Sequence, residues 1–285
     1  MLTREQIDFY HEYGYLSVEN VLSEDEVAEL RIVTDEFVEK SREVTEHTSE
    51  FDLEPGHTPD KPRLRRLKSP ILLHDLYRQL LHHENILAHV SQLIGYGLRT
   101  NGNKLNMKQP GYGSPVEWHQ DWAFYPHTND DLLAVGVVID DMTEENGPLL
   151  VIPGSHKGPI YDHNLDGHFC GAVTDPEFSD KTAVSIMVKA GGITIHHVRM
   201  LHGSMVNTSD HPRRLLLFQY CAIDAFPLSG TNDWDSFNET IVRGEPTNIP
   251  RIEPVPVRMP YPAALRTGSI YESQMVLKES NFGKR

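Results

Sequence analysis

Hydrophobic residues in the first third of the chain recur at helical spacing. Beyond residue 23 the apolar positions fall on one stripe, as in an amphipathic helix: Val27, Leu30, Val33, Phe37 and Val38. Residues 72–94 show a second helical pattern, and Gly95 follows it at the place where glycine commonly ends a helix. The pattern therefore predicts a helical layer at the N-terminal end of the chain, over about residues 1–98.

Polar residues place the starts and ends of these elements. Thr3 and Ser23 are each followed three residues later by Gln or Glu, the spacing of a capping box, so each predicts a helix start. Gly14 is expected to end the first helix, and residues 15–18 to form a short strand. Residues 45–63 are polar and contain three prolines, so we expect a loop there, of the kind that can close over a site.

From about residue 100 the hydrophobic pattern changes to that of strands. Short apolar or alternating runs, rich in β-branched residues, cover residues 104–108, 132–139, 149–152, 183–188, 193–198 and 215–223. Gly, Pro and Asn turns separate these runs, which predicts an all-β sandwich or barrel. We expect one domain over residues 1–285, with a β core over about 99–225 and an extended C-terminal wrap over about 226–285.

Composition excludes several classes of protein. The chain of 285 residues is 39% hydrophobic, and no apolar run approaches the 18 residues that a membrane span needs. Its net charge of −15 disfavours nucleic acid as a partner, because phosphate binding needs clustered cations. Two cysteines, Cys170 and Cys221, make no disulfide framework, and we expect a cytoplasmic protein that binds a small molecule. The sequence does not indicate an oligomeric state.

Candidate chemistry lies in the stretch VEWHQDWAFYPH, where His119 stands two residues before Asp121. On a strand these side chains share a face and can bind adjacent positions of a metal ion, with His202 as a third ligand from another strand. Two histidines and one carboxylate suit Fe(II) with open coordination positions. Arg213 follows at the next strand start and can grip a carboxylate. Each residue alone has an ordinary alternative: a polar pair, a structural histidine, a solvated strand start.

Two segments resemble the phytanoyl-CoA dioxygenase-like family of Fe(II)/2-oxoglutarate-dependent oxygenases. They are WHQDWAFYPHTNDDLLAVGVVIDDMTEENGPLLVIPGSHKGP and GGITIHHVRMLHGSMVNTSDHPRRLLLFQY. The resemblance implies a double-stranded β-helix (jelly roll, cupin-like) with flanking helices. It also implies a dioxygenase that uses Fe(II), 2-oxoglutarate and O2, releases succinate and CO2, and oxidises an unactivated C–H bond of a small metabolite.

The same resemblance assigns roles to individual residues. His119, Asp121 and His202 match the iron ligands, and a carboxylate at residue 121 favours hydroxylation over halogenation. Five residues match contacts to the co-substrate 2-oxoglutarate: Arg213, Ser204, Asn106, Lys104 and Arg66. His197 matches a position of strand packing.

Substrate contacts are the least determined part of the site. Arg199 lies three residues before His202 and can meet an anionic group, unless it is a surface charge. Trp122 and Phe124 can border the substrate pocket, although large aromatic side chains mostly pack in cores. Two rival interpretations stay open: a jelly-roll protein that binds metal or ligand without turnover, and a cupin-type enzyme with another metal. The complete ligand set with its arginine favours the active oxygenase.

Overall fold

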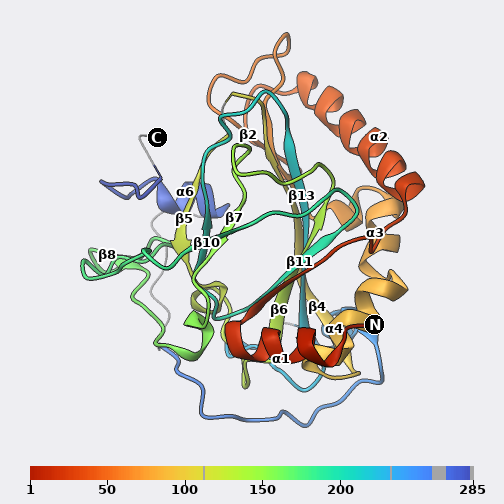
Figure 1. The fold of residues 1–285 in the computed structure, drawn as a ribbon, viewed down its shortest axis with the longest axis vertical. Coiled ribbons are helices and arrows are strands. Elements are labelled where there is room, and N and C mark those ends of the chain that lie inside the picture. Colours follow the sequence, from red (N-terminus) through yellow and green to blue (C-terminus); the bar gives the residue numbers. More distant parts are fainter. Residues whose placement is uncertain (112, 232, 259–267, 283–285) are drawn as a thin grey trace.

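Two antiparallel sheets face each other in the computed structural model, which describes residues 1–111, 113–231, 233–258 and 268–282 (Figure 1). In order across the larger sheet lie β1 (Tyr15–Val18), β11 (Ile193–His197), β6 (Leu132–Val138), β13 (Arg213–Ala222), β4 (Leu98–Lys108), β3 (Leu64–Lys68) and β2 (Phe51–Leu53), and β14 (Ile241–Arg243) also pairs with β4. The smaller sheet runs β10 (Val184–Ile186), β7 (Leu149–Val151), β12 (His202–Ser204) and β5 (Val116–His119). A separate hairpin joins β8 (Asn164–Leu165) to β9 (His168–Phe169).

Helices cover the outer face of the larger sheet. These are α1 (Arg4–Tyr13), α2 (Glu24–Lys40), α3 (Asp75–Leu81) and α4 (Glu84–Ile94), whose apolar sides share one buried cluster with that sheet. Two short helices follow the β core, α5 (Trp234–Glu239) and α6 (Ile270–Gln274). Figure 1 shows α2 and α3 on one side of the molecule and α6 on the opposite side, near β5. Single turns of 3-10 helix lie at Ser41–Glu43, Pro70–Leu72, Asp121–Ala123 and Ser155–Lys157.

Strand β13 separates the core from the space between the sheets. Leu216 and Phe218 belong to the cluster beneath the helices, whereas Leu215 and Leu217 pack against the smaller sheet. This alternation follows from the two-residue period of a strand. The interior of the jelly roll is therefore lined by every second residue of β13, starting from Arg213.

Most elements match the sequence-based predictions. Both capping boxes are present, Gly14 ends α1 with a left-handed φ of 79°, and residues 15–18 form β1. The helical segment 72–94 is divided into α3 and α4, because His83 between them has an extended backbone and its ring pairs with Glu26 on α2.

The expectation of a loop over residues 45–63 is wrong for its middle part. Phe51–Leu53 forms β2, and both of its apolar side chains are buried. Asp52 between them pairs with Lys68 of the neighbouring strand at 2.7 Å. A strand of three residues is too short for alternation to be visible in the sequence, and the three prolines that follow it favoured a loop.

Two further findings bear on the class of protein. Among the residues described, no helix has the length and apolar character needed to cross a membrane. Both cysteines are buried and outside any disulfide.

Arg214 connects the helical layer to the larger sheet. Its Nε and Nη2 donate to the two carboxylate oxygens of Asp140, each at 2.7 Å, and its Nη1 donates to Asp35 of α2 at 2.6 Å. The guanidinium is buried, so its loss would leave the largely buried Asp140 without its main partner. Arg214 thus faces α2, while its neighbour Arg213 faces the interior.

We predict that Arg214→Ala lowers the free energy of unfolding by about 3 kcal/mol, because it removes the buried partner of Asp140 and leaves only the more exposed Arg31, 3.6 Å away. Chemical denaturation measures this loss. Arg4→Ala, which removes an arginine from an exposed ion pair with Asp8, is the control and should change stability little. Equal stability of the two variants would contradict the structural role of Arg214.

Candidate metal and co-substrate site

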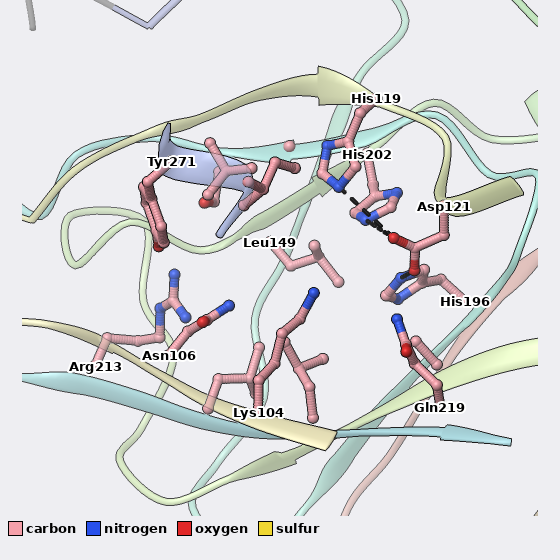
Figure 2. A pocket seen from close by; sticks show the side chains of 17 residues that line it. Lys104, Asn106, His119, Asp121, Leu149, His196, His202, Arg213, Gln219 and Tyr271 are labelled. Carbon is pink, nitrogen blue, oxygen red and sulfur yellow. Dashed lines mark ion pairs between the residues drawn. The ribbon is translucent and has the colours of Figure 1, made fainter. Parts of the chain in front are cut away.

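Three side chains predicted as metal ligands meet between the two sheets. One ligand atom from each of His119, Asp121 and His202 lies within 4.8 Å of the others, and all three residues are buried (Figure 2). The Oδ1 atom of Asp121 is 3.8 Å from His119 Nε2 and 4.0 Å from His202 Nε2. An ion with ligand bonds of about 2.1 Å can bridge gaps of this size.

Strand pairing brings the two histidines together. His119 at the end of β5 is the direct cross-strand partner of His202 on β12, and their ring centroids are 4.0 Å apart. The Nδ1 of His119 bonds the carbonyl of Glu117 at 2.8 Å, and that of His202 bonds the carbonyl of Met200 at 2.9 Å. Each ring therefore carries its proton on Nδ1 and presents the lone pair of Nε2 to the metal position.

Asp121 reaches the site in a different way from the one predicted. Strand β5 ends at His119, and Asp121 begins a turn of 3-10 helix, so the two residues do not alternate along one strand. The turn is fixed by Gln120, whose side-chain amide donates to the carbonyls of Pro159 and Arg199 at 3.1 and 2.9 Å. This anchor directs the carboxylate back toward the two imidazoles.

A third buried histidine, beside the two in the ligand set, was missed by the sequence analysis. His196 Nε2 lies 3.8 Å from Asp121 Oδ2, and its ring centroid is 4.3 Å from that of His202. The alternation of β11 carried a signal for it: Ile193 and Ile195 pack beneath the helices, so His196 faces the interior. The sequence analysis had considered only His197 and had assigned it to packing.

Burial sets the protonation state of the metal ligands. It lowers the pKa of His119 to about 4 and that of His202 well below its usual value. Burial alone would raise the pKa of Asp121, but His196, His202 and Lys104 outweigh it and hold that pKa well below the usual range. Two neutral imidazoles and one carboxylate are the forms that bind a divalent metal.

A cavity of about 50 Å³ extends from these three residues to Arg213. Four of the five predicted co-substrate contacts line it: Lys104, Asn106, Ser204 and Arg213. Figure 2 shows Arg213 and Asn106 at the end opposite the histidines, with the ammonium group of Lys104 between the two ends. Arg213 donates from Nε and Nη2 to the carbonyl of Gly147, at 3.1 and 2.9 Å, so its remaining N–H groups are available to a ligand.

A second cavity, of about 390 Å³, adjoins the first at Lys104 and Asp121. Arg66 lines this cavity together with three aromatic residues, Phe124, Tyr125 and Phe169. The Nε of Arg66 donates to Asn106 Oδ1 at 3.1 Å, which links the two cavities. Arg66 is therefore placed on the other side of Asn106 from Arg213.

Two residues considered as substrate contacts lie elsewhere. Arg199 pairs with Asp130 at 2.8 Å and donates to the carbonyl of Gly158, outside the lining of both cavities. Trp122 packs in a buried cluster, and its indole nitrogen donates to the carbonyl of Pro256 at 2.7 Å. Phe124 does border the second cavity, with its ring centroid 5.9 Å from that of His119. Trp122 is thus a core residue, and Arg199 forms an ion pair with Asp130.

Two histidines and one carboxylate in this arrangement could hold a metal ion, and they match the facial triad of non-haem iron oxygenases. The family model described as Phytanoyl-CoA dioxygenase (PhyH) matches residues 10–215, more than half of the chain. The chain therefore belongs to this family, as the sequence resemblance predicted, and is an oxygenase that uses iron and 2-oxoglutarate.

Relatives and solved structures agree with this class. The probable alpha-ketoglutarate-dependent hypophosphite dioxygenase of Stutzerimonas stutzeri is 36% identical over 98% of this chain and 99% of its own. The L-proline trans-4-hydroxylase of Streptomyces griseoviridis is 29% identical over 76% of this chain and 86% of its own. The non-heme alpha ketoglutarate dependent carbocyclase SnoK from nogalamycin biosynthesis is similar in structure, with a TM-score of 0.66 and 26% identity over 87% of this chain and 94% of its own. The jelly-roll prediction is thereby confirmed.

We predict that His202→Ala weakens binding of Fe(II) by about tenfold or more while the fold survives, because one of three protein ligands is lost. Iron content after anaerobic dialysis measures the effect, with circular dichroism as the check on folding. His211→Ala removes a histidine with a 79% exposed side chain and serves as the control. Wild-type iron content in His202→Ala would exclude this ligand set.

Proposed function

We propose that His119, Asp121 and His202 hold the iron, that 2-oxoglutarate occupies the smaller cavity, and that a small anion is oxidised in the larger one. The observation that carries the proposal is the placement of buried cations. Arg213 ends the smaller cavity, whereas Arg66 lines the larger one and Lys104 lines both. Iron, when bound, would supply the activation of O2 together with the co-substrate.

The smaller cavity suits a dicarboxylic keto acid. One end offers the metal position, and the other offers the free N–H groups of Arg213 and the hydroxyl of Ser204, which also lines the cavity. Arginine binds carboxylates in a planar, two-bond arrangement, and a buried carboxylate needs such a partner. Asn106 and Lys104 line the path between the ends and would contact the middle of the co-substrate.

The larger cavity suits a small anion. Burial lowers the pKa of Arg66, although Tyr271 and Asp52 oppose the shift, and it lowers the pKa of Lys104 to about 8. Asp52 lies 3.9 Å from Arg66 and is more closely paired with Lys68, at 2.7 Å. Arg66 and Lys104 thus retain positive charge toward the cavity, which an anionic substrate would balance. We therefore assign Arg66 to the substrate, whereas the sequence analysis gave it to the co-substrate.

Hypophosphite is the anion that we favour as substrate. The hypophosphite dioxygenase relative matches this chain from end to end, and the cationic cavity is consistent with such a compact oxyanion. In the balanced reaction, hypophosphite, 2-oxoglutarate and O2 give phosphite, succinate and CO2. One oxygen atom enters a P–H bond to make P–OH, and the other enters succinate. This proposal changes the oxidised bond from the C–H bond first expected.

A small amino acid is the second candidate. Its carboxylate could bind Arg66, and its carbon atoms could pack on Phe124 and Phe169 at the cavity wall. The likeness to a proline hydroxylase supports this alternative. Both candidates leave the iron and co-substrate positions unchanged, so the products decide between them.

We also propose that the whole chain acts as one oxygenase unit in the cytoplasm. The N-terminal part supports this because it contributes β1, β2 and β3 to the same sheet as the β core. Two buried cysteines outside any disulfide are consistent with a reducing compartment.

We predict that Arg213→Ala raises the KM for 2-oxoglutarate by about 30-fold or more, since loss of a charged partner in a buried pocket costs about 2–5 kcal/mol. Succinate formation over a range of co-substrate concentrations measures the change. Arg213→Lys is the matched variant. It should recover part of the affinity, because lysine keeps the positive charge but cannot form the two parallel hydrogen bonds of a guanidinium group. An unchanged KM in Arg213→Ala would place the far carboxylate on another cation.

We predict that hypophosphite stimulates succinate formation and is converted to phosphite, which phosphorus NMR detects. Arg66→Gln should raise the KM for hypophosphite by about tenfold or more, because it removes a charged partner, and leave that for 2-oxoglutarate nearly unchanged. Arg63→Gln, on the same segment but outside both cavities, is the control. Stimulation by proline alone would favour the amino-acid alternative. If 2-oxoglutarate binds but neither compound stimulates succinate formation, both substrate proposals are wrong.

A further inference from the structure

Helix α6 brings a side chain to the co-substrate cavity from outside the region that defines the family. The family match ends at residue 215, whereas α6 spans Ile270–Gln274. Ile270 and Tyr271 are 8% and 6% exposed, and both line the smaller cavity. No role for either residue follows from the motifs of the sequence.

Hydrogen bonds fix α6 to the strands that build the site. Glu272 accepts from the guanidinium of Arg65 on β3 at 2.8 Å. Gln274 accepts from the backbone N–H of Glu117 on β5 at 3.1 Å and donates to the carbonyl of Gly171 at 2.9 Å. Ser269 caps the helix in a capping box with Glu272. The helix is thus anchored on both sides of the cavity, close to the strand that carries His119.

Tyr271 stands at the far end of the cavity from the metal ligands. Its ring packs on the guanidinium groups of Arg65 and Arg66, whose central carbons are 4.4 and 5.5 Å from the ring centroid. Figure 2 shows the side chain opposite Arg213, with its hydroxyl end directed toward that residue. Burial raises the pKa of Tyr271, so the hydroxyl keeps its proton and can donate it in a hydrogen bond.

We propose that the Tyr271 hydroxyl donates a hydrogen bond to the far carboxylate of 2-oxoglutarate and completes the co-substrate site. This inference rests on the proposed position of the co-substrate in the smaller cavity. A carboxylate has about four acceptor positions, and Arg213 and Ser204 do not fill all of them. A buried carboxylate that lacks donors is costly, and Tyr271 offers one at the cavity end where Arg213 lies. Helix α6 is then part of the binding site.

The main test compares two keto acids on one variant. Tyr271→Phe keeps the ring on Arg65 and removes only the hydroxyl. Calorimetry on enzyme loaded with Mn(II), which supports binding without turnover, gives the dissociation constants. We expect Tyr271→Phe to bind 2-oxoglutarate about tenfold more weakly or worse, since a hydrogen bond to a charged group is lost. Pyruvate, which lacks the far carboxylate, should bind wild type and variant equally.

The controls separate a binding role from a structural one. Tyr161→Phe removes a tyrosine hydroxyl outside both co-substrate and substrate cavities and should leave both dissociation constants unchanged. Equal loss for pyruvate and 2-oxoglutarate in Tyr271→Phe, or no loss for either, would overturn the inference. If wild-type enzyme with Mn(II) binds no 2-oxoglutarate, the proposed function itself fails, which is a distinct result.

Hydrogen exchange on the wild-type protein gives a second measurement that needs no variant. If Tyr271 binds the co-substrate, 2-oxoglutarate should slow exchange of the amides in Ile270–Gln274 by about tenfold or more, because opening of α6 would then break a bond to a charged group. Pyruvate should have no such effect. Equal exchange with the two keto acids would count against the contact.

Discussion

The register of β12 between β5 and β7 is the constraint on which the site depends. It makes His202 the direct partner of His119 and places both rings in the interior. A shift by one residue would turn one of these side chains to the opposite face of the sheet, because side chains alternate along a strand. The carbonyls that accept from the two Nδ1 atoms each lie two residues before their histidine, so the local backbone that positions each ring also fixes its tautomer.

Strand β13 links the stability of the fold to the geometry of the site. Arg214, Leu216 and Phe218 face the helical layer, and the residues between them face the cavities. Arg213 is held on the carbonyl of Gly147, so its guanidinium has a fixed direction before any ligand binds. Leu216 and Phe218 pack on the other face of β13. Their packing holds the strand in place and so holds the guanidinium of Arg213 in position for a ligand. The adjacent arginines therefore have different physical roles that their sequence alone does not separate.

The convergence of His119, Asp121, His202 and Arg213 on one cavity could be predicted, because the motifs that carry these residues are local and their order along the chain is specific. The other features of the site and fold depend on contacts between residues far apart in the sequence. Arg199 is paired by Asp130, and neither residue type indicates that pairing in advance. Strand alternation would have found His196, whereas nothing local marks Tyr271, which reaches the cavity from a distant helix. The strand at Phe51–Leu53 was hidden because its stability comes from its neighbour rather than its own sequence.

The distribution of buried charge gives each of the two adjoining cavities a cation of its own. Asp121 is the proposed metal carboxylate, and it lies at the wall that the cavities share. Lys104 is on the same wall, and burial makes its positive charge costly in the absence of an anion. A dicarboxylate on the Arg213 side and an anion on the Arg66 side would each balance a separate cation, with Lys104 between them. The same charges would repel a cationic ligand from both positions, so binding of the two anions and exclusion of cations have one physical origin.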